Sequence, residues 1–382
     1  GYTRSYAARV LRDRARYVVV DHGVVDGAKV RLIEDERTRP KKKRKRKRKK
    51  TYDKDVLRAL QTVWLICDGI CGKRLAPYMK TIVAKLERMG ELHLAPETRR
   101  KLLCVSAATI DRMLGPTRKR YQLRARSQTK PGTLLKHQIP IRTFADWDEL
   151  RPGFLEIDLV SHEGGNARGE YAYTLDATDV YTGWTETEAV RNRSQHFVFV
   201  GLEAAMRRFP FDILGIDSDN GGEFINHHLF RYCSTHHITF TRSRQYRKND
   251  NCFVEQKNYS VVRRTVGYCR HDTPAELRVL NELYAVVRLY TNYFQPSMKL
   301  VEKTRTGSTV HKKYDKAKTP YHRVMTSRQI PRQTKRELRS IYATLNPAKL
   351  IRDIGKLQDE LGGLVSSKIE ARQQPELEYI SS

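Results

Sequence analysis

Residues 153–160 read Gly-Phe-Leu-Glu-Ile-Asp-Leu-Val, a stretch in which apolar and acidic side chains alternate. A period of two is typical of a β-strand, in which successive side chains point to opposite faces of a sheet. Leu155 and Ile157 therefore share one face, and Glu156 and Asp158 share the other. This stretch predicts a strand that carries an acidic residue, Asp158, in its middle.

Further strands and helices follow from this first strand. Residues 170–180 and 184–190 also read as strands, and the short turn at 179–183 makes them an antiparallel pair. Beyond them the chain alternates between helices and strands. Helices are predicted after Ser194, after Asn226 and after the polar loop 244–251, and strands over 213–216 and 238–241. This order predicts an α/β domain over 151–296, with a five-stranded mixed sheet and helices on both faces.

Three acidic residues occupy positions where such a sheet can gather them. Asp158 lies in the first strand, Asp219 just past the fourth, and Glu255 one turn into the helix after the polar loop. In this strand order the first and fourth strands are neighbours, so the two aspartates can converge. Carboxylates that converge without basic partners repel one another, and divalent cations remove that conflict. Because Mg²⁺ prefers hard oxygen ligands, these acids are candidate metal ligands.

Two other acids leave alternatives open. Asp217 has the same strand parity as Asp219, so the alternation of the strand cannot choose between them. Glu223 follows the glycine pair after Asp219 and is a candidate supporting group beside the site. Lys257, Arg263 and Arg264 follow Glu255 on its helix, and they are either a solvated face or contacts to a DNA end.

A helical region precedes the sheet. Apolar residues recur at helical spacing from Tyr52, and Pro96 begins a later helix. Ser106 is predicted to cap a short last helix, Ala107 to Leu114, that Gly115-Pro116 should stop. Short helices joined by a tight turn indicate a helix-turn-helix over 51–116, with Thr109 and Arg112 on the candidate recognition helix.

The charge of the chain points to a polyanionic partner. The 382 residues include 73 Lys and Arg against 43 Asp and Glu, a net charge of +30. Ten basic residues run unbroken from Lys41 to Lys50, and no acid occurs from Arg112 to Ala145. Such tracts are typical of segments that follow nucleic-acid phosphates.

The predicted organisation is a partial helical DNA-binding segment (1–38), a basic linker (39–50), the helix-turn-helix (51–116), a second basic linker (117–150), the sheet domain (151–296) and a basic C-terminal region ending in helices (297–382).

The segment Phe154–Pro296 resembles the catalytic core of DDE transposases and retroviral-type integrases, which have the ribonuclease H-like fold. Asp158, Asp219 in Ser-Asp-Asn-Gly-Gly-Glu-Phe, and Glu255 match the three acids of that family, and 35 residues separate Asp219 from Glu255. The motif favours Asp219 over Asp217. The flanking regions resemble bacterial insertion-sequence transposases. One departure is that a helix-turn-helix region stands where retroviral integrases have a zinc-binding His/Cys domain.

The resemblance implies an enzyme that binds the terminal repeats of its own mobile element and integrates it into target DNA. It implies two Mg²⁺ or Mn²⁺ ions at Asp158, Asp219 and Glu255, a homodimer or larger assembly on double-stranded DNA, and a place in the bacterial cytoplasm at the nucleoid. No stretch approaches about 18 consecutive apolar residues, so no membrane helix is predicted. Two alternatives are a structure-specific nuclease on the same fold and a catalytically dead helix-turn-helix regulator.

Overall fold

The computed structural model of the chain describes residues 17–25, 28–35, 51–120, 151–219, 221–224, 226–242, 252–306 and 308–380. By contact, the chain divides into two units, Gly1–Thr51 and Tyr52–Ser382. The basic run at 41–50 and residues 121–150 of the second linker lie outside the described residues.

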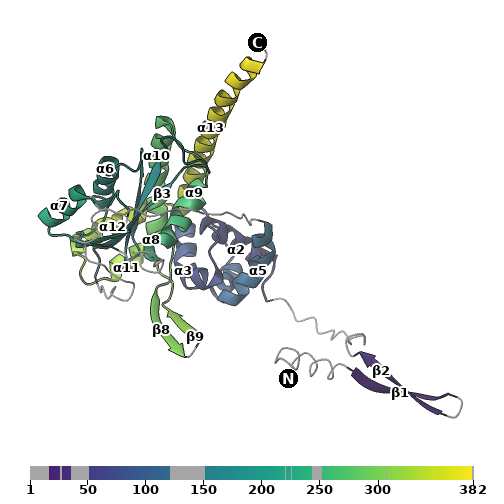
Figure 1. Ribbon diagram of the computed structural model, residues 1–382. Coiled ribbons are helices and arrows are strands. Elements are labelled where there is room, and N and C mark those ends of the chain that lie inside the picture. The colour runs from purple at the N-terminus through teal and green to yellow at the C-terminus, as the bar shows by residue number, and fades with distance from the viewer. Residues whose placement is uncertain are drawn as a thin grey trace. The chain divides into compact units, whose positions relative to one another are not determined.

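The first unit contains a pair of strands. β1 (Tyr17–Val25) pairs antiparallel with β2 (Ala28–Asp35), as Figure 1 shows. The prediction of a helical segment over 1–38 is therefore wrong for these residues, and residues 1–16 of that segment lie outside the described part. Five valines between Tyr17 and Val25, and Val30 and Ile33 after Asp26-Gly27, favour a hairpin, because β-branched residues suit strands and Asp-Gly suits a two-residue turn.

The second unit opens with four helices. They are α2 (Lys54–Ile66), α3 (Gly72–Arg88), α4 (Pro96–Leu103) and α5 (Ala107–Arg120). Their apolar faces meet in a core that includes Leu60, Leu75, Ile82, Leu102 and Ile110. A three-residue turn joins α4 to α5, the local arrangement of a helix-turn-helix.

Gly72 and Asp111 fix the packing of α3 against α5. A Cβ at Gly72 would lie 2.1 Å from the carbonyl oxygen of Ala107, so only glycine allows this approach. Asp111 Oδ1 accepts the N–H of Gly72 at 2.7 Å. Asp111 also forms an ion pair with Arg118 at 2.7 Å. Arg118 lies beyond Leu114, where the helix was predicted to end. Contacts of this kind carry α5 through Gly115-Pro116 to Arg120, so the predicted stop at Leu114 is wrong.

The central sheet has the predicted five strands. They are β3 (Phe154–Ser161), β4 (Tyr173–Asp179), β5 (Thr185–Val190), β6 (Gly215–Ser218) and β7 (Thr239–Arg242), in the order β5-β4-β3-β6-β7. The first three strands form an antiparallel meander, and β6 and β7 run parallel to β3. The first and fourth strands are neighbours, which confirms the prediction on which the convergence of the aspartates depends.

Helices cover both faces of this sheet. On the face of Asp158 lie α8 (Cys252–Lys257), the π-helix η2 (Asn258–Arg263) and α10 (Pro274–Phe294), whose Tyr284 hydroxyl is 2.6 Å from the Thr174 hydroxyl. On the other face lies α6 (Gln195–Met206), where Gly201 lies against Val190. Two shorter helices, α7 (His227–Thr235) and α9 (Arg264–Val266), complete the domain. Asn226 caps α7 as predicted, with its Oδ1 accepting the N–H of Leu229 at 2.9 Å.

The C-terminal region is more ordered than its composition indicates. β8 (Leu300–Thr306) and β9 (Thr309–Tyr314) form a hairpin, followed by α11 (Pro320–Thr326), α12 (Arg332–Thr344) and α13 (Pro347–Ile380). The apolar stripe of α13 packs against α10, and Leu350, Ile354 and Leu361 are buried within the chain. No helix in the described ranges is long and apolar enough to cross a membrane.

Candidate active site

Asp158 lies at the centre of the sheet, on the face that α8 and η2 cover. Its backbone pairs with that of Asp176 on β4. Asn258 Nδ2 donates to Asp158 Oδ2 at 2.6 Å, and the N–H of Leu159 donates to Oδ1 at 2.8 Å. Removal from water raises the pKa of Asp158 to about 7; the negative charge of Asp219 adds to this rise, and Glu255 contributes a smaller part. Two hydrogen bonds therefore fix the orientation of this carboxyl group, and the neighbouring negative charges disfavour its ionised form.

Asp219 directly follows the end of β6 and precedes Gly221 by two residues. The N–H of Gly221 donates to its Oδ1 at 2.9 Å. A Cβ at Gly221 would lie 2.9 Å from that oxygen and 2.6 Å from the Cδ of Glu223, so a side chain there would displace the two carboxyl groups. Burial raises the pKa of Glu223, and the charge of Asp219 adds to the rise. Glu223 therefore lies beside Asp219, where the sequence predicted a supporting group.

Glu255 lies on the exposed side of α8, next to the buried Val254. The start of this helix is anchored by Glu156, whose Oε2 accepts the N–H groups of Phe253 at 2.8 Å and Val254 at 2.9 Å. The first N–H groups of a helix have no acceptor within the helix, and a carboxyl oxygen at this position supplies one whether or not the group is ionised. Strand β3 thus holds the helix at two points, through Glu156 before Glu255 and through Asp158 to Asn258 after it.

Three further acids lie beneath this surface and are fully buried: Glu156, Asp176 and Asp217. Glu156 and Asp217 are backbone partners on adjacent strands, and Thr241 donates a hydrogen bond to Asp217 Oδ1. Asp219, by contrast, is only half-buried. Solvent and a ligand can therefore reach Asp219, whereas Asp217 is enclosed in the sheet.

The donor set suits a hard divalent cation. Repulsion between Asp158 and Asp219 contributes to the raised pKa of Asp158, and a cation between the two carboxyl groups would relieve it. Across the described residues, no three His, Cys, Asp or Glu side chains are grouped so as to hold a metal ion. Mg²⁺ is usually held by one or two carboxylates together with water and substrate phosphates, so a pair of aspartates meets its needs.

The residues that were predicted to contact DNA differ in how exposed they are and in whether they already have a partner in the chain. Arg112 is exposed on α5 and donates to the Thr109 hydroxyl at 3.3 Å, and Ser106 caps that helix as predicted. Lys257 lies near the buried Asp176, and burial lowers the pKa of its ammonium to about 8. Arg263 stacks over the Tyr268 ring at 4.7 Å. Arg264 pairs with Asp68 of the helical region at 2.7 Å, so it is not a purely solvated side chain.

Sequence reasoning missed Glu156 and Asn258. Glu156 shares the strand parity of Asp158, and this was the signal that could have found it. Asn258 follows Glu255 by three residues, which places both side chains on neighbouring positions of one helical face. Neither role is visible without knowing how closely the helix approaches the strand.

We expect Glu156→Ala to destabilise the fold. It leaves the N–H groups of Phe253 and Val254 without an acceptor, at a cost of about 1–3 kcal/mol for each buried group. Glu156→Gln is the matched control, because its amide oxygen can accept the same bonds. Urea unfolding measures both variants. Equal free energies of unfolding for Glu156→Ala and the wild type would show that the anchor contributes nothing.

Comparison with known proteins places this geometry in a family. Residues 149–248, which contain Asp158 and Asp219 and end before Glu255, match the integrase core domain. The uncharacterized protein y4rM of Sinorhizobium fredii (strain NBRC 101917 / NGR234) is 43% identical over 263 residues, which cover 69% of this chain and 75% of that protein.

Solved structures with similarity include the HTLV-2 integrase catalytic core domain in complex with magnesium, at 14% identity and a TM-score of 0.30 over 39% of this chain and 92% of that chain. The simian T-cell lymphotropic virus intasome in complex with a PP2A regulatory subunit has 15% identity and a TM-score of 0.34, over 65% of this chain and 76% of that chain. The chain belongs to the family of y4rM, and its central domain is an integrase core domain of the ribonuclease H-like fold found in DDE transposases and integrases.

Proposed function

We propose that the protein is a DNA transposase or integrase that binds the ends of its own element, cleaves a phosphodiester at each end and joins the freed 3′-hydroxyl to target DNA. The observation that carries this proposal is the pair formed by Asp158 and Asp219. Asp158 lies on β3, and Asp219 lies just past the end of the adjacent parallel strand β6. Both side chains are half-buried, and the negative charge of Asp219 contributes to the raised pKa of Asp158. A site of this kind suits a cation and admits a phosphate.

Asp158 and Asp219 would hold the metal ions, and we propose Glu255, whose negative charge also acts on Asp158, as the third ligand. When bound, Mg²⁺ or Mn²⁺ supplies charge neutralisation at the phosphate and activation of the attacking oxygen. The chain's own side chains prepare the site. Asn258 and the N–H of Gly221 each fix one oxygen of an aspartate, and Glu156 fixes the helix that carries Glu255. Hydrolysis and joining are both in-line substitutions at phosphorus, so one site serves both without a side-chain nucleophile.

The partners follow from this function. The N-terminal helices would read the terminal repeats, and the basic tracts would bind phosphates irrespective of sequence. Since two ends must be processed together, we propose a homodimer or larger assembly on double-stranded DNA. We further propose that the protein acts in the bacterial cytoplasm, at the nucleoid.

Metal dependence tests the proposal. Cleavage and joining of a labelled element end should require Mg²⁺ or Mn²⁺ and stop in excess chelator, whereas Ca²⁺ should support assembly on DNA without turnover. Mg²⁺ should also raise the melting temperature of the wild type, because a ligand that binds only the folded state stabilises it, and this increase should be absent in Asp158→Asn. Full activity in excess chelator would contradict the proposal.

A further inference from the structure

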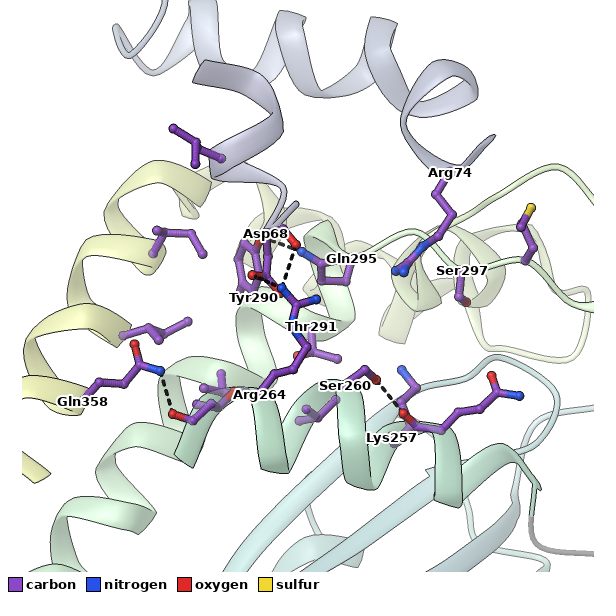
Figure 2. A pocket seen from close by; sticks show the side chains of 18 of the residues that line it. Asp68, Arg74, Lys257, Ser260, Arg264, Tyr290, Thr291, Gln295, Ser297 and Gln358 are labelled. Carbon is purple, nitrogen blue, oxygen red and sulfur yellow. Dashed lines mark hydrogen bonds and ion pairs between the residues drawn. The ribbon is translucent and has the colours of Figure 1, made fainter. Parts of the chain in front are cut away.

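A pocket of about 620 Å³ lies where the helical region meets the integrase core. Its walls come from segments far apart in the chain: the region of α2 and α3, the helix α8 with η2, the end of α10, and α13 (Figure 2). This volume is within the range of small-molecule sites, roughly 300–1,000 Å³, and exceeds what one water-filled gap between helices needs. The pocket is distinct from the acidic site, although η2 borders both.

Cations dominate the charged lining of the pocket. Arg74, Lys257 and Arg264 line it, and Asp68 is the one carboxylate among the lining residues. Asp68 is engaged by Arg264, whose NH2 donates to its Oδ1 at 2.7 Å and to its carbonyl oxygen at 3.1 Å. That ion pair leaves two of the three cations without a carboxylate in the pocket.

Arg74 reaches into the pocket from α3, as Figure 2 shows. Its Nε donates to the carbonyl oxygen of Pro296 at 2.6 Å. In the part of the chain that the structure describes, its two terminal nitrogens form no hydrogen bond or ion pair, and the same holds for the ammonium of Lys257. Burial lowers the pKa of Arg74, and the nearby charge of Arg264 lowers it further. Arg74 is thus a partly desolvated cation that an anion would compensate, whereas Lys257 already lies near the negative charge of Asp176, which is not part of the pocket lining.

We propose that this pocket binds a phosphate group, the source being the backbone of bound DNA or a free phosphate. A guanidinium presents paired N–H donors that match phosphate oxygens, and an ammonium adds a point charge. Ser260 of η2 and Ser297, which follows α10, also line the pocket. A phosphate held there would join Arg74 of the helical region to Lys257 of the core, so binding would tighten the contact between the two regions. In its DNA form the inference rests on the proposed function.

Thermal unfolding in low-millimolar phosphate tests the pocket, with sodium chloride at matched ionic strength as the reference. The wild type should gain melting temperature in phosphate beyond the chloride reference, and Arg74→Gln should lack most of that gain. Arg191→Gln is the matched control, because Arg191 forms a surface ion pair with Glu170 outside the pocket. It should keep the wild-type gain, including any general effect of phosphate on hydration.

A purely structural role for Arg74 predicts something different. Removal of its bond to Pro296 would lower the melting temperature in chloride but leave the phosphate gain intact. That result, or an equal gain in all three proteins, would overturn the proposal. Because this measurement uses no DNA and no turnover, it can succeed even where joining activity fails, which separates the pocket from the proposed function.

DNA binding distinguishes the two sources of phosphate. Anisotropy of a labelled random duplex over a salt series should show Arg74→Gln with a slope lower by about one unit, the equivalent of one phosphate, when the pocket holds the DNA backbone. An unchanged slope together with an abolished phosphate gain would assign the pocket to free phosphate. If Arg74→Gln kept both the wild-type salt slope and the wild-type gain in melting temperature in phosphate, the pocket would bind neither the DNA backbone nor free phosphate, and the proposal would be overturned.

Discussion

Asp158→Asn, Asp219→Asn and Glu255→Gln should each abolish DNA cleavage and joining and leave binding to element ends largely intact. Removing one ligand disables a metal site that stabilises the transition state by several kcal/mol, and a loss of about 4 kcal/mol lowers the rate roughly 10³-fold. Binding persists because affinity comes mainly from basic residues elsewhere. A gel assay of cleaved and joined products, with anisotropy for binding, measures both.

Two further aspartates provide controls. Asp212 is exposed on the loop before β6, so Asp212→Asn should keep full activity. Asp217 is enclosed and accepts a hydrogen bond from Thr241, so Asp217→Asn should lower stability first and activity only as a consequence. If Asp219→Asn stayed active while a well-folded Asp217→Asn was inactive, the choice between these aspartates would be wrong.

Replacing Lys41–Lys50 with Gly and Ser should weaken binding to every DNA sequence. The run offers ten consecutive cations, and an unbroken run of like charges suits contact with phosphates irrespective of base sequence. For each phosphate that the variant no longer neutralises, the slope of log affinity against log salt should fall by about one unit. If the run neutralises six to ten phosphates, raising the salt from about 50 to 200 mM should cost the wild type roughly 10³–10⁵ in affinity through these contacts, and the variant should lose this part of the salt sensitivity. A salt series on specific and random duplexes measures both quantities.

Changes on α5 should have a different effect. Arg112 is exposed there and Thr109 lies one turn before it, so Thr109→Ala with Arg112→Ala should erase the preference for terminal repeats over random DNA and change the salt slope little. Ile110 and Leu114 hold the helix in the core and remain unchanged in this variant. If deletion of the basic run removed specificity and left the slope unaltered, the two roles would have to be exchanged.

The sheet could be predicted because its signals are local. Alternation identified β3, the short turn at 179–183 fixed the meander, and the apolar run at 213–216 marked β6. The order of these strands then placed Asp158 beside the end of β6. The end of α5 could not be predicted, since Gly115-Pro116 signals a stop and the contact between Asp111 and Arg118 overrides it.

Other features depend on contacts between distant segments. Glu156 is recognisable as an anchor only once α8 lies over β3, and the cationic pocket exists only because residues 68, 74, 257 and 264 meet in the fold. The hairpin of β1 and β2 was missed for a different reason. The valine runs and the Asp-Gly pair favour a hairpin, but the whole segment 1–38 was predicted to be helical.

The proposed function requires the acidic site both to cut DNA and to join it to a target. Its most direct test is to incubate the protein with a terminal-repeat duplex and a supercoiled plasmid in Mg²⁺ and to sequence the products. We predict element 3′ ends joined covalently to the plasmid, with a short target duplication of constant length, and no such junctions with Asp158→Asn. Cleaved ends without any junction would contradict the proposed function and identify a nuclease.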